Sequence, residues 1–173
     1  MKINENNLIK YLNKGQWKNE KFDGEGELIY PKDDIINRVS YNGQFKEGEI
    51  SRKGNLLLKS GAKYEGDFEN GRFNGFGVYT YPKEDAGDYY KGHWKDGKLS
   101  GKGKFVFSDG EQYEGDFENN LRNGFGVHTY SKESAGDYYE GHWKDNEKSG
   151  KGKLVWKDGT KQEGIFENGS FKQ

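Results

Sequence analysis

Apolar and polar residues alternate along most of the chain with a period of two. Segments of the form Tyr-x-Gly-x-aromatic, such as residues 64–68, are followed by segments of the form Gly-x-Gly-x-apolar-x-aromatic, such as residues 75–81. A period of two places every second side chain on the same face of a β-strand. Each pair of segments therefore predicts a β-hairpin, with about five residues between its two strands.

The hairpin pattern recurs along the chain. Residues 64–112 and 113–161 align without gaps and are identical at 34 of 49 positions, and each unit divides into a 26-residue and a 23-residue repeat. The repeats are predicted to start at residues 13, 41, 64, 90, 113 and 139, with a partial copy from residue 162, so that the array occupies residues 13–173. Residues 1–12 are predicted to form the N-terminal cap that a stacked array requires.

Glycine and aromatic residues hold fixed places in the repeat. The third residue is always glycine and the fifth is always aromatic, as in Gly66 and Phe68. Glycine normally weakens a strand, so its recurrence beside aromatic residues indicates that a neighbouring ring lies over the bare backbone. We expect an all-β fold, in which stacked hairpins form an elongated, single-layer antiparallel sheet of about thirteen strands whose aromatic face curls into a groove.

Two further features of the array follow from its spacing. The longer repeats carry three extra residues, and residues 82–88 and 131–137 are therefore expected to form loops that protrude from one side of the sheet. The last strand, Glu163 to Glu167, is expected to be an uncapped edge. Because an unpaired edge exposes backbone donors and acceptors, it is predicted to associate with another chain.

Composition restricts the class of protein. Among 173 residues there are 27 Gly, 11 Phe, 12 Tyr and 4 Trp, while hydrophobic residues total only 30%. This excludes a layered globule with an aliphatic core, and the aromatic content argues against disorder. A net charge of −1 argues against a nucleic-acid partner, and zero Cys excludes disulfides and thiolate metal sites. Since apolar runs are far shorter than ~18 residues and no signal core is seen, we expect a soluble cytoplasmic protein.

The sequence carries no enzyme signature. His93 and His142 lie one 49-residue unit apart, and residues that repeat with the unit are expected to have a structural role. His128 has no such counterpart. The acidic residues also repeat in register and leave no unique acid–base pair. The G-x-G pairs lack the spacing of a dinucleotide-binding loop, and the Asp-Gly turns lack the alternating ligands of a calcium loop. We expect a non-enzymatic protein without catalytic residues, cofactor or metal site.

The aromatic face is the first candidate surface. Its rings either form the core or line a groove that docks a helix or an extended segment of a partner. The predicted groove residues are Tyr64, Phe68, Tyr81, Tyr90, Trp94, Phe107, Tyr113, Phe117, Tyr130, Tyr139, Trp143 and Trp156, and Tyr79 and Phe105 share their face.

The opposite face carries two apolar pairs and many charges. Phe76 with Val78 and Phe125 with Val127 either cover the protruding loops and nearby tyrosines or form a sticky outer surface for a partner. The charged side chains form either cross-strand pairs or, where they are basic, a stripe that binds anionic lipid. That stripe comprises Lys91, His93, Lys95, Lys102 and Lys104. Membrane contact is not favoured, because acidic strands lie within a Debye length of ~8 Å.

The pattern Tyr-Glu-Gly-Asp-Phe-Glu-Asn-Gly, followed by Asn-Gly-Phe-Gly-Val, resembles the MORN (membrane occupation and recognition nexus) repeat from residue 13 to about residue 169. The sequence departs from that family where His would precede a glycine of the second strand, since Asn74 and Ser100 stand there. The resemblance implies a curved sheet of hairpins and a protein–protein scaffold in a cytoskeletal, axonemal or ciliary assembly. A peripheral membrane adaptor that binds phosphoinositide is the alternative that it implies.

Overall fold

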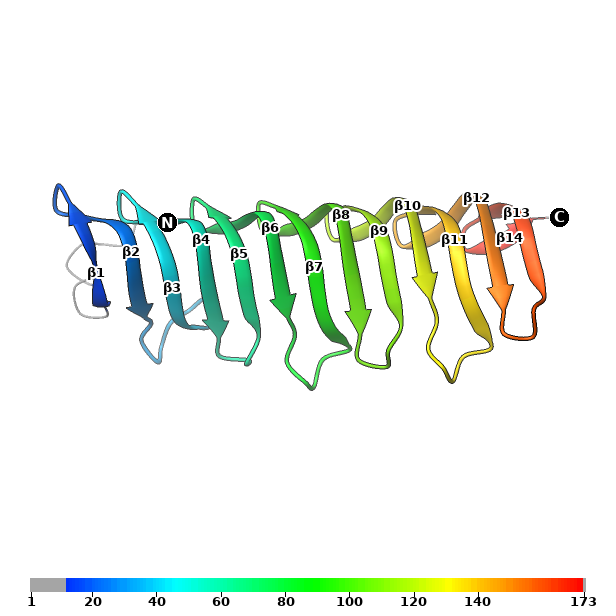
Figure 1. Cartoon of the computed structure of the whole chain (residues 1–173), viewed down its shortest axis with the longest axis horizontal. Coiled ribbons are helices and arrows are strands. Elements are labelled where there is room, and N and C mark those ends of the chain that lie inside the picture. Colours follow the sequence, from blue (N-terminus) through cyan, green and yellow to red (C-terminus); the bar gives the residue numbers. More distant parts are fainter. Residues whose placement is uncertain (1–11, 173) are drawn as a thin grey trace.

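The computed structural model describes residues 12–172, which form one open sheet of fourteen strands (Figure 1). Each strand pairs antiparallel with the strands that precede and follow it in the sequence. The strands are β1 (Leu12–Lys18), β2 (Lys21–Ile29), β3 (Arg38–Lys46), β4 (Glu49–Leu58), β5 (Lys63–Glu69), β6 (Arg72–Thr80), β7 (Gly87–Lys95), β8 (Lys98–Phe107), β9 (Gln112–Glu118), β10 (Leu121–Thr129), β11 (Gly136–Lys144), β12 (Glu147–Trp156), β13 (Lys161–Glu167) and β14 (Ser170–Lys172).

The predicted all-β, single-layer antiparallel sheet is confirmed, with one strand more than expected, but the sheet is open and uncurled and its aromatic face does not curl into the predicted groove. The predicted cap, residues 1–12, lies outside the described residues except for Leu12, which begins β1. Among residues 12–172, no helix is long and apolar enough to cross a bilayer.

Each hairpin closes through a shorter connection than the sequence suggested. Between β5 and β6 only Asn70 and Gly71 lie outside the strands, and their φ angles are 50° and 72°. Positive φ at both central residues is typical of a type I′ turn, whose twist matches that of paired strands. Glu69 therefore pairs directly with Arg72, and the strands extend to the turn.

A row of glycines crosses the sheet beneath the aromatic rings. Gly66 pairs with Gly77, and Gly77 pairs with Gly92 on the next strand. The ring of Tyr64 covers this row, because a Cβ built on Gly77 would lie within 2.6 Å of three of its atoms. The prediction that a ring lies over bare backbone is thereby confirmed.

The rings above the glycine row form a continuous edge-to-face ladder. Tyr64 contacts Phe68 and Trp94 with centroids 5.0 and 5.5 Å apart. Tyr90 contacts Trp94 and Phe117, in each case at 5.2 Å. Such geometry adds about 0.5–1.5 kcal/mol per pair to the burial of the rings. The ladder continues through Tyr113, Trp143, Tyr139 and Phe166.

The polar atoms of the ladder are hydrogen-bonded within the sheet. The hydroxyl of Tyr64 donates to the carbonyl of Asp67 at 2.9 Å, and the indole N–H of Trp94 donates to the carbonyl of Gly77 at 3.4 Å. Buried hydroxyl and indole groups without partners would destabilise the fold. The ladder thus gives a single-layer sheet an apolar core in which these polar atoms have hydrogen-bond partners.

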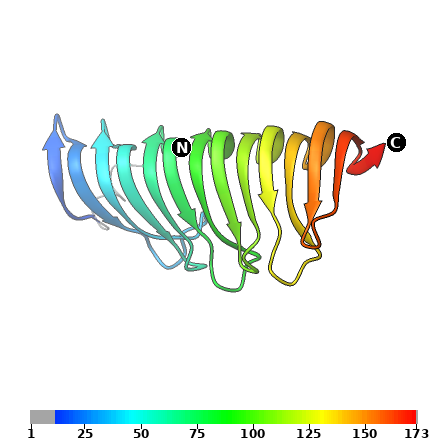
Figure 2. The ribbon, with the colours of Figure 1, turned by 45° about the vertical axis from the view of Figure 1, so that its right-hand side comes forward.

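Three longer loops connect strand ends on one side of the sheet, at the bottom of Figure 1; this side is called the loop edge. They comprise residues 30–37, 81–86 and 130–135, each after the second strand of a hairpin. Figure 2 shows that the strands also bend along their length. The three loops therefore lie beside the side chains at the ends of β2, β6 and β10.

The C-terminal edge differs from the sequence prediction of an uncapped strand. β14 pairs with Ile165–Glu167, and Phe171 lies opposite Phe166 with ring centroids 5.4 Å apart. The last three residues of Glu163–Glu167 are therefore covered, and Phe166 is buried. The overlooked signal is the pair Asn168 and Gly169, which adopts positive φ and closes a further hairpin.

Candidate functional site

Most of the rings predicted to line a groove lie in the core. Eight of the twelve expose 7% or less of their surface. These are Tyr64, Phe68, Tyr90, Trp94, Tyr113, Phe117, Tyr139 and Trp143. All eight belong to the ring ladder, so they support the sheet and present little surface to a partner. The other four, which are Tyr81, Phe107, Tyr130 and Trp156, are only half-buried.

Half-buried rings gather beside the ladder, most of them where the strands run into the longer loops, whereas Phe73 lies near the start of β6 and stacks on Tyr64. We define the aromatic row as Phe73, Tyr79, Tyr81, Phe105 and Phe107, of which the first four pack against the core and Phe107 packs on Phe105. Centroids lie 4.7 Å apart for Tyr79 and Tyr81, 5.3 Å for Tyr81 and Phe105, and 4.6 Å for Phe105 and Phe107. The row is therefore contiguous and extends from β6 to β8.

Burial governs the ionisation of the tyrosines in the aromatic row. Desolvation raises the pKa of Tyr81 to about 12, and the nearby charges of Tyr79 and Asp85 act in the same direction. Desolvation also raises the pKa of Tyr79. Both phenols are neutral at physiological pH, so the row offers aromatic surface with hydroxyl groups at its edge.

The same face is polar in the second 49-residue unit. Arg122 stands where the first unit has Phe73, His128 where it has Tyr79, and Lys148 where it has Leu99. We define the polar cluster as Glu111, Arg122, His128 and Lys148. The guanidinium carbon of Arg122 lies 4.2 Å from the Trp143 ring centroid, and Lys148 Nζ lies 5.2 Å from that of Tyr139. The cluster lines a depression of about 330 Å³.

Hydrogen bonds fix the protonation state of His128, which is only 5% exposed. Its Nε2 lies 2.9 Å from Glu111 Oε2, and its Nδ1 lies 3.1 Å from Arg122 Nη1. Since the guanidinium can only donate, Nδ1 must accept, and Nε2–H donates to the carboxylate. Burial lowers the pKa of His128, against the raising effect of its hydrogen bond to Glu111. The imidazole is therefore neutral.

Sequence reasoning missed the polar cluster and Phe73. Of the cluster, only His128 was considered from the sequence, as an isolated histidine, and Phe73 falls outside the repeated aromatic positions. The available signal was the comparison of the two 49-residue units. Substitutions of Phe73, Tyr79 and Leu99 by ionisable residues on one face mark a local change of environment.

The opposite face, here called the outer face, holds the two apolar pairs. Phe76 and Phe125 are 42% and 43% exposed, while Val78 and Val127 are half-buried. Phe76 contacts the ring of His93 at 5.7 Å between centroids. Phe125 contacts His142 in the same way at 5.6 Å. A depression of about 580 Å³ lies between the two phenylalanines.

The predicted lipid-binding stripe lies in and around this depression. Lys91, His93, Lys102 and Lys104 line it. Lys95 is exposed at the end of β7, where it pairs with Lys98 and not with the lining residues.

Two of the lysines face one another across the sheet. Lys91 of β7 lies opposite Lys104 of β8. In the second unit the same positions are Glu140 and Lys153, a complementary pair. The first unit therefore concentrates positive charge at this point. Like charges directly opposite on adjacent strands are destabilising.

Acidic residues neutralise part of the stripe. Lys102 Nζ forms an ion pair with Asp116 at 2.8 Å, and Lys104 lies opposite Glu114 on β9. Among residues 12–172, no group of three or more His, Asp or Glu side chains is arranged to hold a metal ion.

Comparison with known proteins agrees with the hairpin architecture. The MORN repeat family model matches six segments, residues 14–35, 41–63, 64–86, 90–112, 113–134 and 139–161. A search among curated proteins finds no match to the sequence. MORN repeats are generally involved in binding proteins or membrane lipids. The six matches span most of the array of paired hairpins described above, and the chain therefore belongs to the MORN repeat family.

Proposed function

We propose that the protein is a non-enzymatic scaffold that docks a helical or extended segment of a protein partner on the aromatic row. The observation that supports this most directly is the contiguous set of half-buried rings beside a closed core ladder. Aromatic side chains that are fixed on one side and open on the other are enriched at protein interfaces.

The polar cluster suggests the chemistry of the docked segment. Phe107 lies 6.1 Å from His128 between ring centroids, so the aromatic row and the polar cluster are continuous. Arg122 and Lys148 bring two positive charges to this end, against Glu111 and a neutral His128. A segment with apolar side chains over the row and a carboxylate over the cluster would match both surfaces.

Site-specific photo-crosslinking tests this proposal. A photoreactive phenylalanine analogue placed at Tyr81 or Phe107 should crosslink a protein partner in extracts. The same analogue at Phe76 or Phe125, on the outer face, is the matched control and should crosslink much less. Crosslinking confined to the outer-face positions would contradict docking on the aromatic row.

We further propose that this scaffold acts in the cytoplasm, within a cytoskeletal, axonemal or ciliary assembly. The proposal rests on the family resemblance and on the elongated sheet, which offers successive surfaces along one axis (Figure 1). Imaging of the tagged protein together with tubulin and actin markers tests it. A diffuse distribution that leaves with the soluble fraction would contradict it.

A second candidate function is binding of anionic lipid headgroups on the outer face. The observation that favours it is the juxtaposition of Lys91 and Lys104, whose repulsion an anion would relieve. Co-sedimentation with phosphoinositide-containing vesicles should then be lost in Lys91→Glu. Lys153→Glu makes the same charge change in the second unit, at the position equivalent to Lys104, and should retain binding. Equal binding of both variants and of the wild type would contradict this function.

A further inference from the structure

The three protruding loops share one backbone design. In each, a residue of the loop donates its N–H to the carbonyl three residues earlier, at 3.0, 3.0 and 3.2 Å for Asp34 to Pro31, Asp85 to Pro82 and Ser134 to Ser131. In each, the residue at the end of a neighbouring strand donates its N–H to the loop, at 2.8, 2.9 and 3.2 Å for Lys59 to Asn37, Ser108 to Ala86 and Lys157 to Ala135. The loops of residues 81–86 and 130–135 are of equal length and can be compared position by position, whereas the loop of residues 30–37 is longer and shares only these two bonds.

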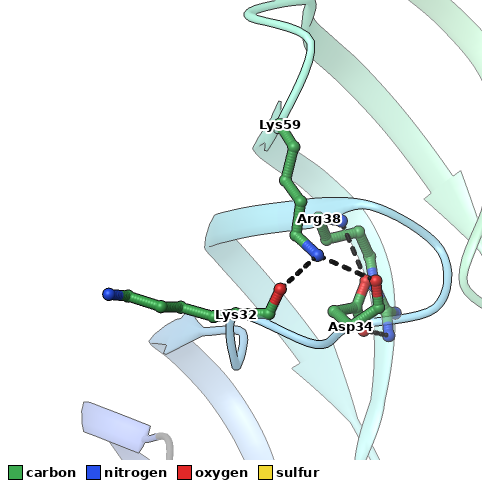
Figure 3. A network of polar contacts seen from close by, with 4 residues as sticks. All are labelled: Lys32, Asp34, Arg38 and Lys59. Carbon is green, nitrogen blue, oxygen red and sulfur yellow. Dashed lines mark hydrogen bonds and ion pairs between the residues drawn. The ribbon is translucent and has the colours of Figure 1, made fainter.

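In two of these loops a lysine ammonium sits among the loop carbonyls. Lys59 Nζ donates to the carbonyls of Lys32 at 2.7 Å and Asp34 at 3.0 Å (Figure 3). This ammonium comes from the end of β4 and reaches across to the loop before β3. A compact cation with three N–H donors suits a ring of carbonyl oxygens.

The third loop in the chain repeats this arrangement with one more ligand. Lys157 Nζ donates to the carbonyls of Ser131 at 2.9 Å and Ser134 at 2.7 Å, and also to that of Lys132. Three backbone carbonyls thus converge on a single positive charge. The carbonyls of this loop therefore surround the Lys157 ammonium.

The middle loop has the same backbone but lacks the lysine. Ser108 stands where the other loops have Lys59 and Lys157, and its hydroxyl reaches only the carbonyl of Ala86, at 3.1 Å. Within the described part of the chain, no side chain donates to the carbonyls of Pro82, Lys83 or Asp85. The loop that lacks the ammonium also carries a carboxylate, Asp85, where its sister loop has Ser134.

We propose that the loop of residues 82–85 binds an inorganic cation at the place that the Lys157 ammonium occupies in the sister loop. The carbonyls of Pro82, Lys83 and Asp85 supply oxygen ligands, and the Asp85 carboxylate supplies negative charge beside them. Water completes the shell. This donor set of carbonyls, carboxylate and water is that of Ca²⁺, whereas Mg²⁺ demands a stricter octahedron and is expected to bind less well. A monovalent ion such as K⁺ would use the carbonyls alone.

The site lies directly beside the aromatic row. Tyr81 opens the same loop and donates its N–H to the carbonyl of Asp88 at 2.9 Å. A bound cation would therefore hold the backbone that positions this ring. This consequence for partner docking rests on the proposed function, whereas the cation site itself does not.

Thermal unfolding of the full chain, stripped of metal with a chelator, tests the site. Ca²⁺ should raise the melting temperature by about 2–4 °C, the size expected for a modest gain in stability in a chain of this length. MgCl₂, KCl and choline chloride at equal ionic strength serve as comparisons. Asp85→Ser should remove a response to Ca²⁺ but retain one to K⁺, which separates the two ions.

Two reciprocal variants make the test specific to the loop. Ser108→Lys should raise the melting temperature without added cation and abolish the response, because the ammonium fills the site. Lys157→Ser should lower the melting temperature and add an increment with K⁺ but not with Ca²⁺, because its loop offers the same carbonyls but has Ser134 in place of Asp85. Identical melting of the wild type in every salt, or an undiminished response in Ser108→Lys, would overturn the proposal. Neither result depends on crosslinking to a partner, so the two proposals fail separately.

Discussion

The phenol ring of Tyr64 lies across Gly77 on the neighbouring strand, so close that a Cβ built on the glycine would stand 2.4 Å from the phenol oxygen. Tyr113 and Gly126 repeat the relationship at the same distance one unit later. The contact joins the two unusual features of the composition, because each ring needs a bare backbone on which to lie.

Replacement of Gly77 by alanine should therefore destabilise the fold. The added methyl group meets the phenol ring of Tyr64, and overpacking of this kind costs about 1–3 kcal/mol. Urea denaturation measures the change in the free energy of unfolding. Thr80→Ala, at the exposed end of the same strand, is the control and should remain within about 0.5 kcal/mol of the wild type. Equal losses in both variants would show that the ring contact is unimportant.

The polar cluster should behave as a coupled unit. Arg122→Phe alone removes the donor to His128 Nδ1 and should cost about 1–3 kcal/mol, because a buried acceptor is left without a partner. Arg122→Phe combined with His128→Tyr restores the residues of the first unit, where Phe73 stacks on Tyr64 with centroids 3.8 Å apart. The double variant should therefore be more stable than the single one. Additive losses in a double-mutant cycle would contradict the coupling.

His128 should make stability depend on pH. Its pKa is lowered in the folded state from an ordinary value of 6.5, so the unfolded chain binds the proton more readily. The contribution of His128 is fully present above pH 6.5 and is lost as the pH falls toward the lowered folded value. Denaturation midpoints between pH 5 and 7.5 should show this slope, and it should be smaller in His128→Tyr. An unchanged slope would assign the pH dependence to other groups.

At the facing lysines of the outer face, Lys91 and Lys104, a substitution should stabilise the fold. Lys91→Glu recreates the complementary pair of Glu140 and Lys153 and should raise the free energy of unfolding by about 0.2–1 kcal/mol. Glu140→Lys is the reciprocal variant and should lower it by a similar amount. Added salt should shrink both differences, since exposed charges are screened. Effects of the same sign in both variants would contradict the pairing argument.

The fold was predictable because its determinants are local. The alternation of apolar and polar residues determines which face of the sheet each side chain occupies. The fixed places of glycine in the repeat show where each hairpin begins. The connection within each hairpin was predicted too long, since residues such as Glu69 and Arg72 pair right up to the turn. Only the positive φ of Asn70 and Gly71 shows that two residues are enough to form the turn between β5 and β6.

The candidate site was less predictable, because exposure depends on what lies beneath each ring. Tyr64 and Tyr81 share a face and a residue type, yet only Tyr64 rests on the glycine row and is buried. Tyr81 lies toward the loop edge and keeps one side open. The contact between Glu111 and His128 joins the approach to β9 with the end of β10, so it follows from strand register and not from sequence spacing.

The strand order has a consequence for the length of the molecule. Every strand pairs only with its neighbours in the sequence, and the Tyr64–Trp94 contact at 5.5 Å recurs as Tyr113–Trp143 at 5.4 Å. A whole 49-residue unit can therefore be inserted or deleted with matching surfaces on both sides of the junction. The number of 49-residue units therefore sets the length of the sheet.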